Sequence, residues 1–68
     1  MKKIIILMPV YNDWESLIKV LDEINLTIKD ISDYEFNCII VNDCSSKEKL
    51  KIKKPINFSS LKIINMRE

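Results

Sequence analysis

The fold is decided by the stretch IIILMPVYNDWESLIKVLDEI, residues 4–24 of the chain. It opens with the apolar run Ile4–Val10, which is rich in β-branched residues and shows no alternation with polar residues. Such a run is typical of a strand whose two faces are both covered, as in a parallel sheet. We therefore predict a strand over residues 3–8 that ends at Pro9, followed by a helix.

The helix is expected to begin at Asn12 and to run to about residue 30. Asn12 is a favourable N-cap residue, and Glu15 lies three residues later, which is the spacing of a capping box. The apolar residues that follow recur every three or four positions and so define one face of a helix. These apolar residues are Trp14, Leu17, Ile18, Leu21, Ile24, Ile28 and Ile31.

Two further strands complete the predicted fold. Residues 36–41 form a second apolar run, in which Asn37 is the polar exception, and residues 61–66 form a third. Strand, helix and strand in this order imply a right-handed βαβ unit with parallel strands. The polar residues 42–46 are interpreted as a loop, while residues 47–54 fit either a short helix or an edge strand. The fold class is therefore α/β, with a parallel sheet in βαβ(α)β order.

The bulk composition excludes several classes of protein. The chain has 68 residues, enough for one domain, and its net charge of +1 gives no general reason to expect nucleic acid or an anionic membrane as a partner. It contains no glycine, which excludes the dinucleotide-binding fingerprint and the P-loop. With two cysteines and no histidine, neither structural zinc nor a disulfide framework is expected. The longest apolar run is far shorter than the about 20 residues of a membrane span. We expect a reduced, cytoplasmic protein.

Candidate functional residues follow the first two predicted strands. In an open parallel sheet, ligands bind outside the carboxyl ends of the strands. This places Tyr11, Asn12 and Asp43 near one another if the two strands are adjacent. Tyr11 offers a flat ring for stacking on a base, and Asp43 offers a carboxylate that accepts an N–H; the alternative interpretation is a loop tyrosine and a turn aspartate. The lysines of residues 47–54 are interpreted as a solvated face.

Two segments together resemble the N-terminus of family 2 glycosyltransferases, which are inverting enzymes with the GT-A fold. The segments are residues 4–24, quoted above, and YEFNCIIVNDCSS, residues 34–46. The family pattern is an apolar strand ending in P-x-Y-N, a helix, and then Y-E-I-I-V-V-D-D-G-S. The resemblance covers roughly residues 3–46, and residues 61–68 fit the third strand of the family. It implies a partial Rossmann-like GT-A fold.

The resemblance implies a nucleotide-binding role for Pro9, Val10, Tyr11 and Asp43. The first three would lie against the base, usually uracil, with Tyr11 stacking on it, and Asp43 would accept the base N–H. The donor would be a nucleotide-sugar, typically UDP-linked, and the acceptor would be a hydroxyl group, in the synthesis of cell-envelope glycans or glycolipids. A divalent metal, Mg²⁺ or Mn²⁺, is implied for the full-length enzyme.

The chain also departs from the family pattern. Asn42 replaces the first aspartate of the pair, and Cys44 stands where glycine is usual. Residues 47–68 match neither the D-x-D motif nor the catalytic base of the family, so we assign no catalytic residue and no metal ligand.

We therefore expect residues 1–68 to be the N-terminal, nucleotide-binding portion of a transferase domain, inactive alone. Any membrane association would be made through other regions. Such a portion should leave one edge of the first strand without a partner and expose apolar surface. The alternative is a non-catalytic nucleotide-binding or interaction module with a flavodoxin-like sheet.

Overall fold

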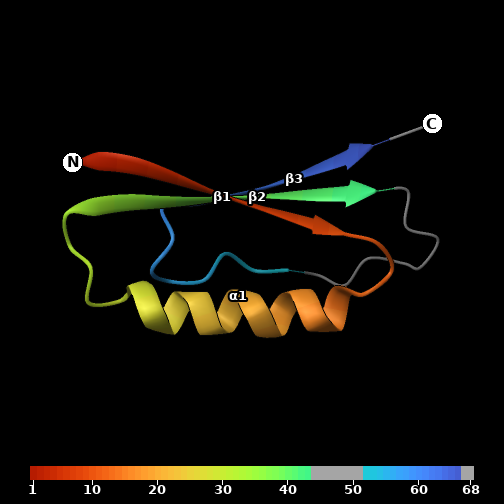
Figure 1. Ribbon diagram of the computed structural model, residues 1–68, viewed down its shortest axis with the longest axis horizontal. Helices are drawn as coiled ribbons and strands as arrows, with labels where there is room; N and C mark the ends of the chain where they lie inside the picture. Colours follow the sequence, from red (N-terminus) through yellow and green to blue (C-terminus); the bar gives the residue numbers. More distant parts are fainter. Residues whose placement is uncertain (44–51, 67–68) are drawn as a thin grey trace.

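The structure, a computed structural model, describes residues 1–43 and 52–66 (Figure 1). A single sheet in the order β1-β2-β3 lies above one helix, and both strand pairs are parallel. This confirms the predicted α/β class and the parallel sheet. The elements are β1 (Lys2–Val10), α1 (Trp14–Ile28), β2 (Tyr34–Asp43) and β3 (Ser60–Met66).

The first strand continues through Pro9 to Val10, so the prediction that Pro9 ends it is wrong. Proline lacks the N–H that a central strand would need for its hydrogen-bond ladder, and in sheets it is found mainly on edge strands. In the described part of the chain β1 is such an edge strand, because it pairs with β2 alone. The expectation of one edge without a partner strand agrees with this order.

Helix α1 starts one residue later than the capping-box pattern predicted. Asp13, not Asn12, is the N-cap, and its carboxylate accepts a hydrogen bond from the backbone N–H of Ser16 at 3.2 Å. Asn12 instead adopts a left-handed backbone conformation, with φ of 59°. Asparagine tolerates this conformation better than most residues, so Asn12 makes the turn that precedes the cap.

The helix also ends earlier than predicted, at Ile28. Ile31 lies beyond it and is exposed, and its backbone N–H bonds to the carbonyl of Ile28 at 3.0 Å. No helix in the described residues is both long enough and apolar enough to cross a membrane.

The core lies between the sheet and α1. Side chains alternate along each strand, so that Met8 and Val10 of β1 and Cys38 and Ile40 of β2 point toward the helix. The buried apolar residues are Met8, Val10, Trp14, Leu17, Leu21, Ile28, Phe36, Cys38, Ile40 and Phe58. The predicted helical face is thus confirmed at four of its positions, with Ile24 partly buried against the same core.

Residues 52–59, which lead into β3, pack beside α1 without forming a helix or a strand (Figure 1). Two hydrogen bonds of 2.9 Å fix this segment to the helix: the backbone N–H of Asn57 donates to Oδ1 of Asn25, and Nδ2 of Asn57 donates to the backbone carbonyl of Asn25. Phe58 then inserts its ring into the core. The two alternatives for residues 47–54 fall mostly on residues 44–51, which lie outside the described residues.

Within residues 1–43 and 52–66, nothing covers the opposite face of the sheet. Helix α1 and residues 52–59 lie on the same side of the sheet (Figure 1). The strand order β1-β2-β3 advances in one direction across the sheet. Right-handed connections between parallel strands in such an order lie on the same face of the sheet. Ile5 and Leu7 of β1 point to the other face and are exposed. Among the described residues, β1 is therefore covered on one face only, and its other face exposes apolar surface, as expected.

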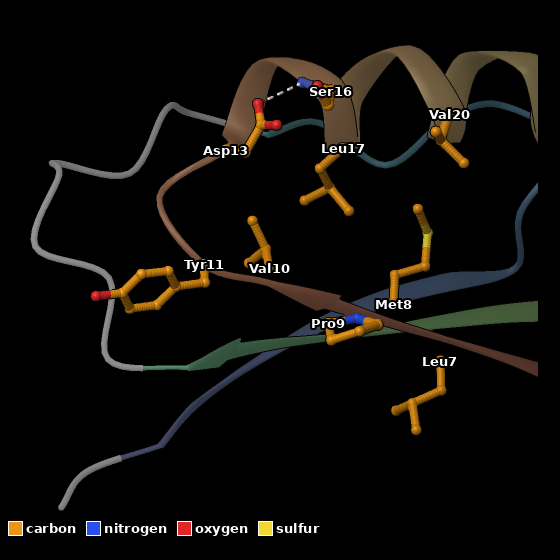
Figure 2. Close-up of a pocket in the computed structure, with 9 residues that line it drawn as sticks. All are labelled: Leu7, Met8, Pro9, Val10, Tyr11, Asp13, Ser16, Leu17 and Val20. Carbon is orange, nitrogen blue, oxygen red and sulfur yellow. Dashed lines mark hydrogen bonds between the residues drawn. The ribbon is translucent and has the colours of Figure 1, made fainter.

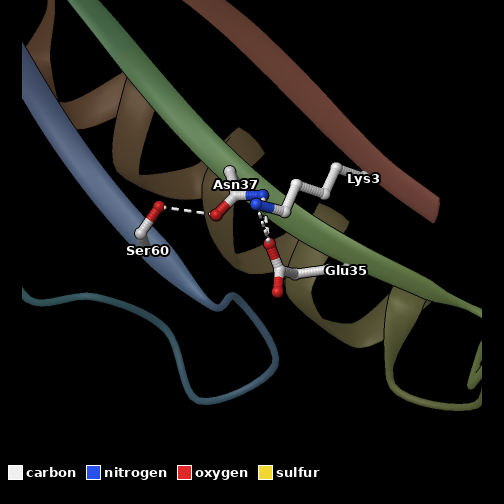
Figure 3. Close-up of polar contacts among 4 residues, drawn as sticks. All are labelled: Lys3, Glu35, Asn37 and Ser60. Carbon is white, nitrogen blue, oxygen red and sulfur yellow. Dashed lines mark hydrogen bonds and ion pairs between the residues drawn. The ribbon is translucent and has the colours of Figure 1, made fainter. Parts of the chain in front are cut away.

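A polar network occupies the amino-terminal part of this open face (Figure 3). Ser60 donates to Oδ1 of Asn37 at 2.7 Å, and Nδ2 of Asn37 donates to Oε2 of Glu35 at 3.2 Å. The same carboxylate oxygen lies 3.9 Å from Nζ of Lys3. Asn37, the polar exception in an apolar strand, is therefore accounted for by its position on this face.

Candidate functional site

The carboxyl ends of the three strands meet at one edge of the sheet. Val10 is in register with Asn42, and Asn42 is in register with Asn65. Tyr11 follows directly after β1, and Asp43 is the last residue of β2. The register therefore places these two predicted site residues at the same edge, as the parallel topology required.

Tyr11 is accessible to a ligand. Its side chain is 64% exposed, and Figure 2 shows the ring extending past the end of β1, away from α1. Asn12, with its left-handed φ of 59°, turns the chain back toward the helix directly after Tyr11. A ring in this position can stack on a planar group.

Pro9 and Val10 point to opposite faces of the sheet (Figure 2). Val10 is 5% exposed and packs in the core beneath α1, whereas Pro9 is exposed on the open face. A ligand at the edge of the sheet can therefore reach Val10 through its backbone, but its side chain is occupied by the core.

Asp43 is exposed at the end of β2. The buried residues of β2 are Phe36, Cys38 and Ile40, so by alternation Asp43 belongs to the set that faces the open side of the sheet. Asp43 and Pro9 therefore share this side. Val10 lies on the other side.

A groove runs between β1 and α1 at the same end of the molecule (Figure 2). Its volume is about 350 Å³, and it contains three of the four predicted residues but not Asp43. Apolar side chains and the Asp13–Ser16 cap form the rest of its wall. The lining residues are Leu7, Met8, Pro9, Val10, Tyr11, Asp13, Ser16, Leu17 and Val20. Of the lining residues beyond Tyr11, only Leu17 was predicted from the sequence, as part of the apolar face of the helix.

Asn65 also belongs to this edge, and the sequence analysis did not single it out. Nδ2 of Asn42 donates to Oδ1 of Asn65 at 2.9 Å, which joins the ends of β2 and β3. Asn42 thus supplies an amide donor to a neighbouring amide. Only the β2–β3 register pairs these two residues, so no local signal could have revealed the contact.

Trp14 brings a buried hydrogen-bond donor to the start of α1. The side chain is buried in the core, and its Nε1 has no hydrogen-bond partner among the described residues. The predicted core role of Trp14 is confirmed.

The described residues do not provide a metal centre. They contain no group of three or more His, Cys, Asp or Glu side chains placed to hold an ion. Asp43 alone is too small a ligand set for Mg²⁺ or Mn²⁺. We therefore assign no metal to these residues and derive no chemical step from one.

Comparisons with known proteins identify no relative of this chain. No family model matches it, no curated protein matches it, and no solved structure matches its fold. The fold and site place it among α/β proteins with an open parallel sheet and an exposed carboxyl edge.

Proposed function

We propose that this chain binds a nucleotide at the carboxyl edge of its sheet, as the nucleotide-binding half of the donor site of a glycosyltransferase. The observation that supports this most is the register of Val10 with Asn42, which brings Tyr11 and Asp43 to one edge. The ring of Tyr11 would stack on a uracil base, and the carboxylate of Asp43 would accept the hydrogen bond of its N3–H. The GT-A resemblance of residues 3–46 supports the same assignment.

The groove between β1 and α1 gives a second argument. In parallel α/β sheets ligands bind outside the carboxyl ends of the strands. The groove lies at this end of the molecule, and Pro9, Val10 and Tyr11 line it. A complete transferase would place its metal and diphosphate contacts in other parts of the protein.

The transfer reaction belongs to such a complete enzyme. There, a sugar would move from a nucleotide-sugar, such as a UDP-sugar, to an acceptor hydroxyl. The contribution of residues 1–68 is to hold the base, and this chain alone is expected to be inactive.

A titration of the chain with UDP, followed by NMR, tests base binding. We expect chemical-shift changes at Tyr11, at Asp43 and at the backbone of Val10 with UDP at millimolar concentration. Asp33 directly precedes β2, and Tyr34 is its first residue. Both lie at the opposite end of the sheet and serve as internal controls. If neither Tyr11 nor Asp43 shifts, the site is not where we propose.

Paired variants make the same test specific. Tyr11→Ala and Asp43→Asn should each weaken UDP binding several-fold, because each removes one of the two base contacts. Tyr34→Ala and Asp33→Asn make the same chemical changes at the other end of the sheet and should leave binding unchanged. Equal binding of ADP and UDP would favour the alternative, a general nucleotide-binding module, over a uridine-specific donor site.

A further inference from the structure

We propose that the edge of β1 that has no partner strand among residues 1–43 and 52–66 is a self-association surface, on which β1 of a second copy pairs antiparallel to join the two sheets. This inference is independent of the proposed function, because it concerns the side of β1 rather than the carboxyl ends of the strands. An unpaired strand edge presents backbone N–H and C=O groups that readily pair with another strand.

Apolar surface continues around this edge from one face of the sheet to the other. On the open face, Ile5 and Leu7 are 63% and 64% exposed. On the helix side, the groove beside β1 is lined by Met8, Leu17 and Val20. A strand added here would cover apolar side chains on both faces of the sheet.

The other edge of the sheet is more polar. Strand β3 carries Ser60, Lys62 and Asn65 among its residues, and Ile64 is 41% exposed. Charged residues on an edge strand oppose pairing with another strand. Lys62 lies within β3, whereas the two charged residues of β1, Lys2 and Lys3, lie at its amino end and leave the apolar run that follows uninterrupted.

The sequence of β1 is self-complementary when two copies run antiparallel. With the two-fold axis at Ile6, Ile5 of each copy lies opposite Leu7 of the other, and Ile4 lies opposite Met8. A two-fold interface requires this kind of match, because the same patch contributes both sides. Pro9 limits the ladder to the residues before it, because it cannot donate a hydrogen bond.

Charge favours the antiparallel arrangement over the parallel one. Lys2 and Lys3 lie at the amino end of β1, and the carboxylate of Asp13 lies just beyond its carboxyl end. Antiparallel pairing brings the lysines of each copy toward Asp13 of the other. Parallel pairing would place lysine beside lysine, which is repulsive.

The mass of the chain in solution, measured by light scattering over a range of concentrations, tests the proposal. We expect a concentration-dependent shift toward twice the mass of one chain. Leu7→Lys should return the protein to a monomer. Leu26→Lys, at an equally exposed leucine (64%) on α1, is the matched control and should leave the dimer intact. A wild-type chain that stays monomeric into the high micromolar range overturns the proposal.

Two more variants identify the surface. Ile64→Lys changes the open face near β3 without touching the β1 edge, so it should not dissociate the dimer; if it does, the copies pack face to face and the proposal is wrong. Ile6→Cys should form a disulfide-linked dimer on mild oxidation when it is made in a Cys44→Ala background. The other cysteine of that variant is Cys38, which is buried. Absence of that cross-link in a chain that is dimeric would likewise exclude a two-fold axis at Ile6.

Discussion

Nδ2 of Asn42 donates a hydrogen bond to Oδ1 of Asn65 at 2.9 Å, and this contact joins the carboxyl ends of β2 and β3 beside the proposed base site. The two residues are 23 positions apart in sequence and are directly opposite in the parallel register. The contact thus links the ends of two strands whose order the sequence alone did not establish.

We predict that Asn65→Ala lowers the free energy of unfolding by about 1 kcal/mol or less, because the lost hydrogen bond is exposed to water. Urea denaturation measures the change. A double-mutant cycle with Asn42→Ala isolates the contribution of the pair from the other contacts of each side chain. A coupling energy of zero would show that the two amides do not bond in solution.

Separate replacement of Asp13 and Glu15 tests which residues cap α1. The structure has Asp13 as the N-cap, whereas the sequence pattern predicted a capping box of Asn12 and Glu15. Asp13→Ala should destabilise the protein by about 1 kcal/mol, because it removes the acceptor for the backbone N–H of Ser16. Glu15→Gln should cost only a few tenths of a kcal/mol, through weaker interaction with the helix dipole. Thermal melts followed by circular dichroism report both. If Glu15→Gln destabilised the protein more than Asp13→Ala, the result would support the predicted capping box of Asn12 and Glu15.

Truncation of a core leucine should unfold much of the protein. Leu21 is 2% exposed, and Leu21→Ala should cost about 2–5 kcal/mol, a large share of the stability of so short a chain. Leu26 lies on the exposed side of the same helix, so Leu26→Ala should change stability by less than about 0.5 kcal/mol. Equal effects in urea denaturation would mean that α1 packs through a different face.

Burial raises the pKa of the Cys38 thiol above its ordinary value, and the thiol lies 3.8 Å from the sulfur of Met8. The neutral thiol is therefore favoured in the folded state. Its contribution to stability is complete below the ordinary thiol pKa of about 8.5 and is lost as the pH rises through the higher folded value.

We therefore expect the stability of the wild-type chain to fall more steeply above about pH 8.5 than that of Cys38→Ala. Urea denaturation at several pH values measures both slopes. In a Cys44→Ala background, Cys38 should also react slowly with a thiol reagent until denaturant is added. Parallel slopes and rapid labelling of the native protein would contradict the buried position of Cys38.

Much of the fold follows from local pattern. The uninterrupted apolar residues of Ile4–Val10 and the spacing of Leu17 and Leu21 each act within a few residues, so periodicity alone predicted strand and helix correctly. The start of α1 was predicted one residue too early, because two adjacent residues both favour the N-cap position. Asn12 and Asp13 are both good caps, and the choice depended on which backbone could adopt φ of 59° and make the turn from β1.

The candidate site was predictable only in part. Tyr11 and Asp43 were placed together from topology, and the register of β1 with β2 brings them to the same edge. The side to which each side chain points could not be predicted from the strand ends, because one residue more or less in a strand exchanges the faces. The burial of Val10 and the exposure of Pro9 depend on that alternation.

The sequence by itself determined the parallel α/β class, the apolar face of α1 and the absence of glycine-based phosphate sites, because these depend on residue type and short-range periodicity. For the residues that the structure describes, the tertiary structure decided that β1 is an edge strand, that one face of the sheet is open, and that Asn65 bonds to Asn42. Those features depend on strand order and register, which arise from contacts between residues far apart in the chain. Local sequence patterns do not encode them directly.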